Sequence, residues 1–242
     1  MIGIILAGGK GKRMKSPLPK VLHKICGKPM IYYVLHSMSS LKEIKKIIVV
    51  VGYKKDMVKK EVKGAEIAIQ KKRLGTADAV KSCRNILKRY NEDILIVCGD
   101  IPLITSKTLF CLIKKHKKNK SDLTIITIFV KDPAGYGRII RDSQKDVVGI
   151  IEEKDCNEIQ KKIQEINSGI YCFNWQKLNK ALSKIKINKL KKEYYLTNVI
   201  SIFKKKRYKI NTFLAKDSSE IMGVDTRERL KEAEKWRKDG KK

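Results

Sequence analysis

The chain alternates short runs rich in isoleucine and valine with longer segments in which apolar residues recur at helical spacing. The short runs cover residues 2–6, 46–51, 94–97 and 123–130. Their nearly continuous apolar character is typical of parallel strands that are covered by helices on both faces. Segment 76–88 has the complementary pattern, because its apolar residues return every three or four positions. The sequence therefore predicts an α/β fold with a mixed, mainly parallel sheet covered by helices.

The pattern changes after residue 130. Shorter strand-like pieces occur at 138–140, 147–151 and 169–173, separated by glycine and aspartate. We expect these pieces to form a smaller β-rich insertion built against the sheet. An amphipathic helix is predicted over 226–238, and the tail 239–242 is expected to fray.

The organisation along the chain indicates one domain over residues 1–242, without an internal repeat or a proline-rich linker. It divides into two halves, 1–130 and 131–225, followed by a C-terminal helix and tail over 226–242. No apolar run approaches the roughly 18 residues that a membrane span needs, and the N-terminal run ends in glycine and lysine without a cleavage-type signal. We expect a cytoplasmic protein that does not associate with membranes.

The chain is strongly basic, with 56 Lys and Arg against 25 Asp and Glu and a net charge of +31. The lysines are spread along the whole length, as in the run from Lys114 to Lys120, and no basic strip carries interleaved aromatic residues. This distribution favours solvated helix faces over a specific nucleic-acid interface. A basic nucleic-acid binder remains an alternative, which salt-dependent binding would test.

Cysteine and histidine do not form catalytic or metal-binding patterns. The six cysteines at 26, 83, 98, 111, 156 and 172 contain no C-x-x-C pair, and they are interpreted as small buried apolar residues. The histidines His23, His36 and His116 are interpreted as structural or surface residues.

The stretch LAGGKGKRM, which follows the first apolar run, indicates an anion site. Glycines at 8, 9 and 11 let backbone N–H groups approach a ligand closely, and Lys10, Lys12 and Arg13 add positive charge. The ligand we expect is a phosphate chain. The stretch is not a Walker A loop, because the glycine spacing fails and no Ser or Thr follows the lysine. It is not a dinucleotide fingerprint either, because position 14 is methionine. A glycine turn with ordinary surface lysines is the alternative for this stretch taken alone.

LAGGKGKRM followed by PKVLH resembles the signature of the sugar-1-phosphate nucleotidyltransferases. The resemblance implies the Rossmann-like nucleotide-diphospho-sugar transferase fold, with 1–130 as the nucleotide-binding half and 131–225 as the sugar-binding half. It also implies that Arg13 and Lys20 are the catalytic cations that neutralise the triphosphate. The turn that would wrap the triphosphate consists of Leu6, Ala7, Gly8, Gly9 and Gly11.

Two further segments of the first half resemble this family. In QKKRLGTADAV, Gln70 matches a glutamine that contacts uracil, and Gly75 and Thr76 open a helix beside it. In VCGDIPL, Gly99 precedes Asp100, which matches an aspartate that binds Mg²⁺. Taken alone, the first is a helix N-cap and the second a turn residue.

The second half carries GYGRI, IEEKD, EINSGIY, EYYLTN and GVDTRERL in the order found in bacterial N-acetylglucosamine-1-phosphate uridylyltransferases. The resemblance covers nearly the whole chain. It implies transfer of a uridylyl group from UTP to N-acetylglucosamine-1-phosphate, a cell-wall precursor step that needs Mg²⁺. The residues implied for the amino sugar and ribose are Gly137, Glu152 and Asn167, with Tyr194, Tyr195 and Thr197 near the sugar. The second metal ligand implied is Asp225.

The sequence departs from that pattern in four ways. Gly8 replaces the usual alanine, Asp225 the usual asparagine and Asn198 the usual aspartate. The Asp100–Asp225 pair is expected to bind a cation more tightly while adding charge that opposes the triphosphate. The family's hexapeptide-repeat acetyltransferase region is not found in these 242 residues. We expect this chain to lack acetyltransferase activity, to be a monomer and to work beside a separate acetyltransferase.

Two alternatives share these motifs. One is another sugar nucleotidyltransferase, such as a glucose-1-phosphate uridylyl- or thymidylyltransferase or a molybdenum cofactor guanylyltransferase. The other is a non-catalytic protein that senses nucleotide sugars on the same fold. The EINSG and EYYLT segments favour an amino sugar, and a complete set of cations and carboxylates favours an enzyme.

Overall fold

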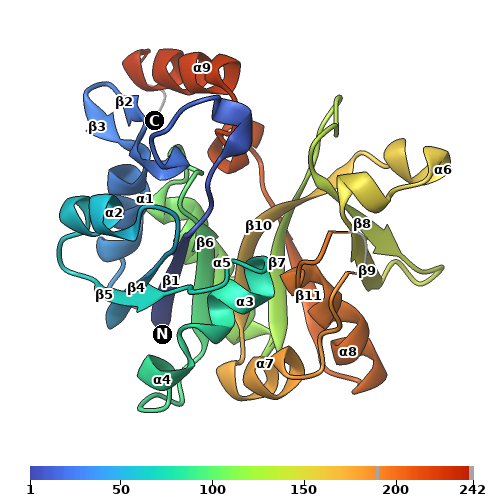
Figure 1. Ribbon diagram of the computed structural model, residues 1–242. Coiled ribbons are helices and arrows are strands. Elements are labelled where there is room, and N and C mark those ends of the chain that lie inside the picture. Colours follow the sequence, from blue (N-terminus) through green and yellow to red (C-terminus); the bar gives the residue numbers. More distant parts are fainter. Residues whose placement is uncertain (189–190, 240–242) are drawn as a thin grey trace.

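The computed structural model describes residues 1–188 and 191–239, in which helices flank a central mixed sheet (Figure 1). Its main path runs in the order β11-β7-β10-β6-β1-β4-β5. The strands of this path are β1 (Ile2–Ala7), β4 (Lys46–Val51), β5 (Glu66–Ile69), β6 (Ile94–Cys98), β7 (Leu123–Phe129), β10 (Glu165–Phe173) and β11 (Ile210–Leu214). All four apolar runs of the first half are therefore confirmed as strands.

The helices lie on both faces and at the ends of the sheet. They are α1 (Met30–Ser39), α2 (Lys55–Glu61), α3 (Thr76–Lys81), α4 (Arg84–Leu87), α5 (Ser106–Lys118), α6 (Glu158–Lys161), α7 (Trp175–Leu182), α8 (Val199–Lys205) and α9 (Arg227–Lys238). No helix in the described ranges is long and apolar enough to cross a membrane.

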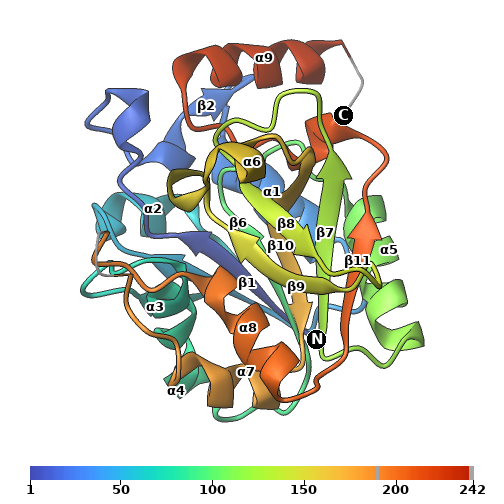
Figure 2. The ribbon, with the colours of Figure 1, turned by 90° about the vertical axis from the view of Figure 1, so that its right-hand side faces the viewer.

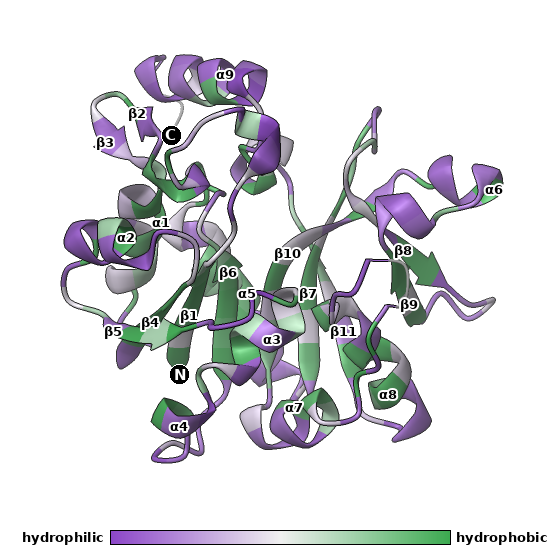
Figure 3. Cartoon of the chain, viewed as in Figure 1, coloured by the Kyte–Doolittle hydropathy of each residue, from purple (hydrophilic) through white to green (hydrophobic). Residues whose placement is uncertain are grey.

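Strand β4 explains why the runs are apolar throughout. Ile48 and Val50 join the core under α3, α7 and α8, whereas Val49 and Val51 join the core under α1, α2 and α5. Successive side chains of a strand point to opposite faces, so a strand covered on both sides has no polar face. Figure 3 shows the consequence, because the strands are green while the outer helix faces are largely purple.

The sheet is parallel from β6 through β1 and β4 to β5, and β11 also runs parallel to β7. Strand β10 is antiparallel to both of its neighbours, β6 and β7. The expectation of a mixed, mainly parallel sheet is thus confirmed. Strand β10 begins at Glu165, four residues before the predicted piece, and it lies inside the main sheet.

The β-rich insertion is built on the first part of β10. Strands β8 (Gly137–Arg141) and β9 (Val147–Ile151) form an antiparallel pair, and β8 bonds to β10 at Ile166 and Asn167. The register of β10 against β7 shifts between Asn167 and Tyr171, and Gly169 lies in this irregular stretch at φ 77°. Figure 2 shows β8 and β9 lying across the β10 side of the sheet.

The predicted helix over 76–88 is wrong in one respect, because it is split into α3 and α4. The Ser82 hydroxyl donates to the Asp78 carbonyl at 3.0 Å, and the Cys83 amide donates to the Val80 carbonyl, three residues back. This tighter i→i+3 bonding ends the regular α-helical ladder at Ser82.

The predicted C-terminal helix is confirmed as α9, and the Oγ1 of its N-cap Thr226 accepts from the Arg229 amide at 3.2 Å. Ala233 of α9 packs with Ile25 and Met30, beside the two-residue strands β2 (Lys24–Ile25) and β3 (Lys28–Pro29). The end of the chain is therefore folded back over the N-terminal half (Figure 1). Most of the predicted frayed tail, residues 240–242, lies outside the described residues.

The interpretation of the cysteines as buried apolar residues agrees with the structure only in part, whereas His116 agrees with its structural interpretation. Cys83 and Cys172 are buried, as expected, but Cys26 is exposed and the other three are intermediate. His116 is buried with its Nδ1 2.9 Å from Thr124 Oγ1, in agreement with a structural role.

Candidate active site

The glycine-rich turn follows β1 at the carboxyl end of the parallel strands, where α/β sheets place ligands. Gly8 is required by a close approach, since a Cβ there would lie 2.7 Å from Gln70 Oε1. Gly11 has φ 69°, and a Cβ there would lie 2.5 Å from the Cβ of Lys20. The turn can therefore expose its backbone N–H groups to an anion only because these positions carry no side chain.

A cleft of about 790 Å³ opens in front of this turn. Twelve of the predicted site residues line it: Leu6, Ala7, Gly8, Gly9, Gly11, Lys20, Gln70, Gly75, Thr76, Asp100, Glu152 and Tyr195. Segments from β1, β5, β6 and the second half thus meet at one place. Sequence reasoning missed Lys72 and Arg73, which also line the cleft and add positive charge.

Lys20 forms an ion pair with Asp100, the residue two positions beyond β6. Burial alone would lower the pKa of Lys20, but the Asp100 carboxylate more than offsets this and the pKa is raised. The Lys20 side chain is therefore a permanent cation at neutral pH. It is placed at the floor of the cleft beside Asp100.

The second carboxylate, Asp225, is 7% exposed and lies next to Asp100 in space. The Val224 amide donates to the Asp100 carbonyl at 2.8 Å, which ties together two segments that are far apart in the sequence. Arg13 Nη2 is 2.5 Å from Asp225 Oδ2, although the Arg13 side chain is 63% exposed. Each carboxylate is thus matched by one of the two predicted catalytic cations.

Arg229 is a further partner of Asp225 that sequence reasoning missed. Its Nη1 lies 3.4 Å from Asp225 Oδ1 and donates to the Gly223 carbonyl at 3.3 Å. Its guanidinium also lies 5.0 Å from the ring centre of Tyr136. The i,i+4 spacing of Asp225 and Arg229 across the start of a predicted helix is the signal that could have found this contact.

The paired carboxylates fit a Mg²⁺ ion by their chemistry. Mg²⁺ prefers hard oxygen ligands and is commonly held by one or two carboxylates together with substrate phosphates. Within 1–188 and 191–239 no group of three or more His, Cys, Asp or Glu residues could hold a metal by itself. Asp100 and Asp225 would therefore hold the ion together with further oxygen ligands, such as substrate phosphates.

A smaller cavity of about 200 Å³ adjoins the cleft, and the two share Leu6, Thr76, Cys98 and Glu152. The predicted sugar residues Gly137, Asn167 and Thr197 line it. Residues not predicted from the sequence also line it: Cys98, Gly135, Tyr136, Ser168, Gly169, Tyr171 and Leu196. Tyr194 is in neither lining, and its carbonyl instead accepts from the Ala77 amide at 2.9 Å.

Polar groups in the smaller cavity are arranged by hydrogen bonds. Thr197 Oγ1 donates to Glu152 Oε1 at 2.9 Å, and Asn167 Nδ2 donates to the Tyr171 hydroxyl at 2.7 Å. Burial raises the pKa of Glu152 above its ordinary value. In the larger cleft, burial raises the pKa of Tyr195 to about 12, so its hydroxyl stays protonated at neutral pH. The cavity offers donors and acceptors suited to hydroxyl and amide groups.

Four predicted residues lie outside both linings: Arg13, Gly99, Tyr194 and Asp225. The Gly99 amide donates to the Leu6 carbonyl at 2.9 Å and so joins β6 to the start of the turn.

Burial raises the pKa of Cys98 to about 12, which keeps this thiol protonated and unsuited to nucleophilic attack at neutral pH. The arrangement supports charge neutralisation rather than covalent catalysis.

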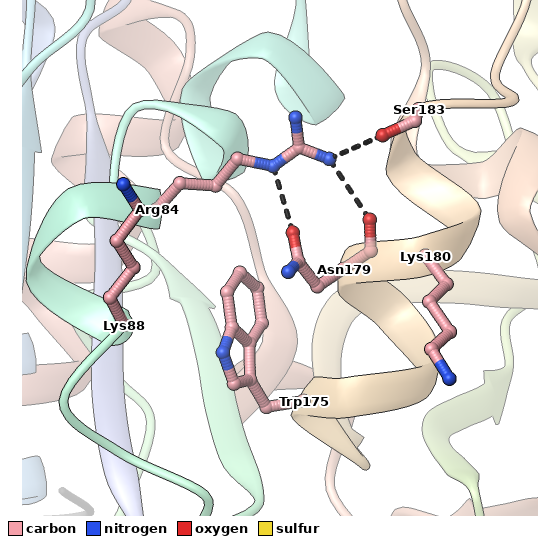
Figure 4. Close-up of a pocket in the computed structure, with 6 residues that line it drawn as sticks. All are labelled: Arg84, Lys88, Trp175, Asn179, Lys180 and Ser183. Carbon is pink, nitrogen blue, oxygen red and sulfur yellow. Dashed lines mark hydrogen bonds between the residues drawn. The ribbon is translucent and has the colours of Figure 1, made fainter.

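Another cavity, of about 400 Å³, lies between α4 and α7, at the opposite end of β1 from the glycine-rich turn (Figure 1). Arg84 crosses it and donates to Asn179 Oδ1 at 2.8 Å, to the Asn179 carbonyl at 2.9 Å and to Ser183 Oγ at 2.8 Å (Figure 4). Because these acceptors occupy the guanidinium, we interpret Arg84 as a structural link between the two helices.

This fold and cleft define a nucleotidyltransferase: residues 2–237 match the nucleotidyl transferase family, and the chain belongs to it. Within that class it is similar to the bifunctional protein GlmU of Clostridioides difficile, at 44% identity over 96% of this chain and 50% of the relative. GlmU of Pelotomaculum thermopropionicum is 41% identical over 98% of this chain and 52% of the relative. The chain spans about half the length of these curated relatives.

A solved structure assigned to glucose-1-phosphate thymidylyltransferase, from Bacillus anthracis, has the same fold. It superposes with a TM-score of 0.74 at 21% identity, covering 98% of this chain and 95% of the other. At this identity the similarity concerns the fold alone.

Proposed function

We propose that the protein transfers the uridylyl group of UTP to N-acetylglucosamine-1-phosphate and releases pyrophosphate. The observation that carries the proposal is that the glycine-rich turn, Lys20 and Asp100 line one cleft, and that the segment of Asp225 is hydrogen-bonded to Asp100. The similarity to proteins named GlmU supports the uridylyl and amino-sugar assignments.

In the proposed reaction a phosphate oxygen of the sugar-1-phosphate attacks the α-phosphorus of UTP in line. A new P–O bond forms, and the bond between the α-phosphorus and the bridging oxygen of pyrophosphate breaks. The attacking phosphate is already an anion, so no base is needed. Catalysis then comes from positioning and charge neutralisation.

Each group in the cleft has a task in this scheme. The N–H groups of the turn at Gly8–Gly11 cradle the triphosphate, and Lys20 and Arg13 offset charge on the triphosphate and the leaving pyrophosphate. Glu152, Asn167 and Thr197 orient the sugar. Asp100 and Asp225 hold Mg²⁺, which supplies charge neutralisation on the reacting phosphates when bound.

A second candidate is another sugar-1-phosphate nucleotidyltransferase, such as a glucose-1-phosphate uridylyl- or thymidylyltransferase. The observation that favours it is Asp225, because sister families with other sugars also use a pair of aspartates at the metal. A non-catalytic sensor is disfavoured by the matched cations and carboxylates, which a binder does not need.

The proposal also covers the substrates, the cellular location and the oligomeric state of the protein. The substrates are a nucleoside triphosphate and a sugar-1-phosphate, which places the enzyme's work in the cytoplasm, where such phosphates are made. The chain is proposed to work as a monomer. Mass measurement in solution tests the last point, and a dimer or trimer would contradict it.

The test of the proposed function is pyrophosphate release with Mg²⁺ across UTP, dTTP, CTP and GTP. Each nucleotide is combined with N-acetylglucosamine-1-phosphate, glucosamine-1-phosphate or glucose-1-phosphate. We expect release with UTP and N-acetylglucosamine-1-phosphate. Preference for another pair would support the second candidate, and no release with any pair would favour the sensor.

A further inference from the structure

The carboxamide of Gln70 is held in one orientation. Its Nε2 lies 2.9 Å from the Gly75 carbonyl and 2.9 Å from Asp78 Oδ2. A carbonyl and an ionised carboxylate can only accept hydrogen bonds, so the NH₂ group of Gln70 must face them. The carboxamide oxygen Oε1 therefore points away from Asp78.

Asp78 is itself fixed at the start of α3. The same oxygen, Oδ2, accepts a second hydrogen bond from the Leu74 amide at 3.1 Å. Gly75 has φ 96°, a conformation that glycine adopts readily and that directs its carbonyl to Gln70. Gln70 is 6% exposed, so its side chain has little room to turn. Loop 74–75 and helix α3 together form a clamp on the amide.

The oxygen of Gln70 is directed to the nucleotide side of the cleft. A Cβ on Gly8 would lie 2.7 Å from Oε1, and both Gly8 and Gln70 line the 790 Å³ cleft. The group that Gln70 offers beside the glycine-rich turn is thus a hydrogen-bond acceptor. A base placed there is complementary to it only if it presents an N–H.

We propose that Asp78 is a positioning residue that sets base selection by holding Gln70 Oε1 toward the cleft. The inference rests on the proposed function and on the match of Gln70 to a glutamine that contacts uracil, because it takes the base to lie against Gln70. Uracil carries a hydrogen at N3 and pairs with Oε1, whereas cytosine has an unprotonated N3, which leaves two acceptors facing each other. Thymine shares the N3–H of uracil, so this contact does not separate those two bases.

The test compares wild type with Asp78→Ala, Asp78→Asn and the matched control Asp56→Ala, whose residue is exposed on helix α2. Affinities for UTP and CTP are measured by calorimetry, and kcat/KM is measured for both nucleotides with N-acetylglucosamine-1-phosphate. We expect Asp78→Ala to reduce the UTP-to-CTP ratio about tenfold, through weaker use of UTP. Asp78→Asn keeps an acceptor for Leu74 and Gln70, so it retains most of the ratio, as does Asp56→Ala.

The ratio is insensitive to partial misfolding, because both nucleotides are measured on the same sample. An unchanged ratio in Asp78→Ala, or an equal loss for UTP and CTP, would overturn the inference. So would a wild-type protein that binds CTP as well as UTP. If wild type releases no pyrophosphate, the proposed function fails, and the binding ratios alone still decide the role of Asp78.

Discussion

At the scale of single residues, the two carboxylates of the site are separable by mutation. We expect Asp100→Ala to lower turnover by more than about 100-fold at saturating Mg²⁺, because a lost metal ligand removes several kcal/mol of transition-state stabilisation. Pyrophosphate release measures the effect, with Asp56→Ala as control. Near-wild-type turnover would refute the metal assignment of Asp100.

Asp225→Asn tests the effect of an aspartate at the position where the family usually has an asparagine. The substitution keeps an oxygen ligand but removes a charge, so we expect the Mg²⁺ concentration for half-maximal rate to rise about tenfold while the rate at saturating Mg²⁺ changes less. A Mg²⁺ titration of initial rates measures this. A lower Mg²⁺ requirement would contradict the expected gain from the second carboxylate.

Glu152 makes stability depend on pH in a direction set by its raised pKa. The folded state binds this proton more readily than the unfolded state, where the pKa is near 4.5. The contribution to stability is therefore complete below pH 4.5 and is lost as pH rises through the higher folded-state pKa. The side chain of Glu152→Gln stays neutral. As the pH rises through the folded-state pKa of Glu152, we therefore expect the Tm of this variant to increase relative to that of wild type. If the Tm of the two proteins changes with pH in parallel, the predicted contribution of Glu152 to the pH dependence of stability is wrong.

At the scale of elements, the link between α4 and α7 is predicted to be structural. Arg84→Ala removes three hydrogen bonds and is expected to lower the free energy of unfolding by about 2 kcal/mol, measured by denaturant titration. Pyrophosphate release in the proposed reaction should be little changed, since the link is at the other end of the sheet. The control Lys88→Ala changes an exposed residue of the same cavity and should stay within about 0.5 kcal/mol. Loss of activity in a stable Arg84→Ala variant would indicate a functional role instead.

The boundaries of helices and strands could be predicted where a single strand or helix pattern of apolar residues continues over the whole segment. Lys46–Val51 and α9 agree with the sequence pattern because each has a strong local signal. The break between α3 and α4 was missed, since it depends on the Ser82 side chain bonding to the backbone. The early start of β10 was missed because Glu165 and Asn167 are polar. Glu165 is nevertheless buried and pairs with Arg141 at 2.6 Å, and Asn167 is half-buried.

At the scale of the whole molecule, the charge of +31 is expected to cause only weak association with nucleic acid. DNA binding should fall by orders of magnitude between about 50 and 200 mM salt and show no sequence preference. A gel-shift series over these salt concentrations tests this. Binding that survives moderate salt and depends on sequence would revive the nucleic-acid alternative.

The sequence by itself determined the class of fold and the glycine-rich turn. These are local properties, since strand and helix periodicity and the freedom of glycine act within a few residues. Most other residues of the cleft were predicted from the resemblance to a known family. The tertiary structure alone decided the antiparallel place of β10, the contact of Arg229 with Asp225 and the clamp of Asp78 on Gln70. Each of these depends on which groups the folded chain brings side by side, because hydrogen bonds and ion pairs act only over a few ångströms.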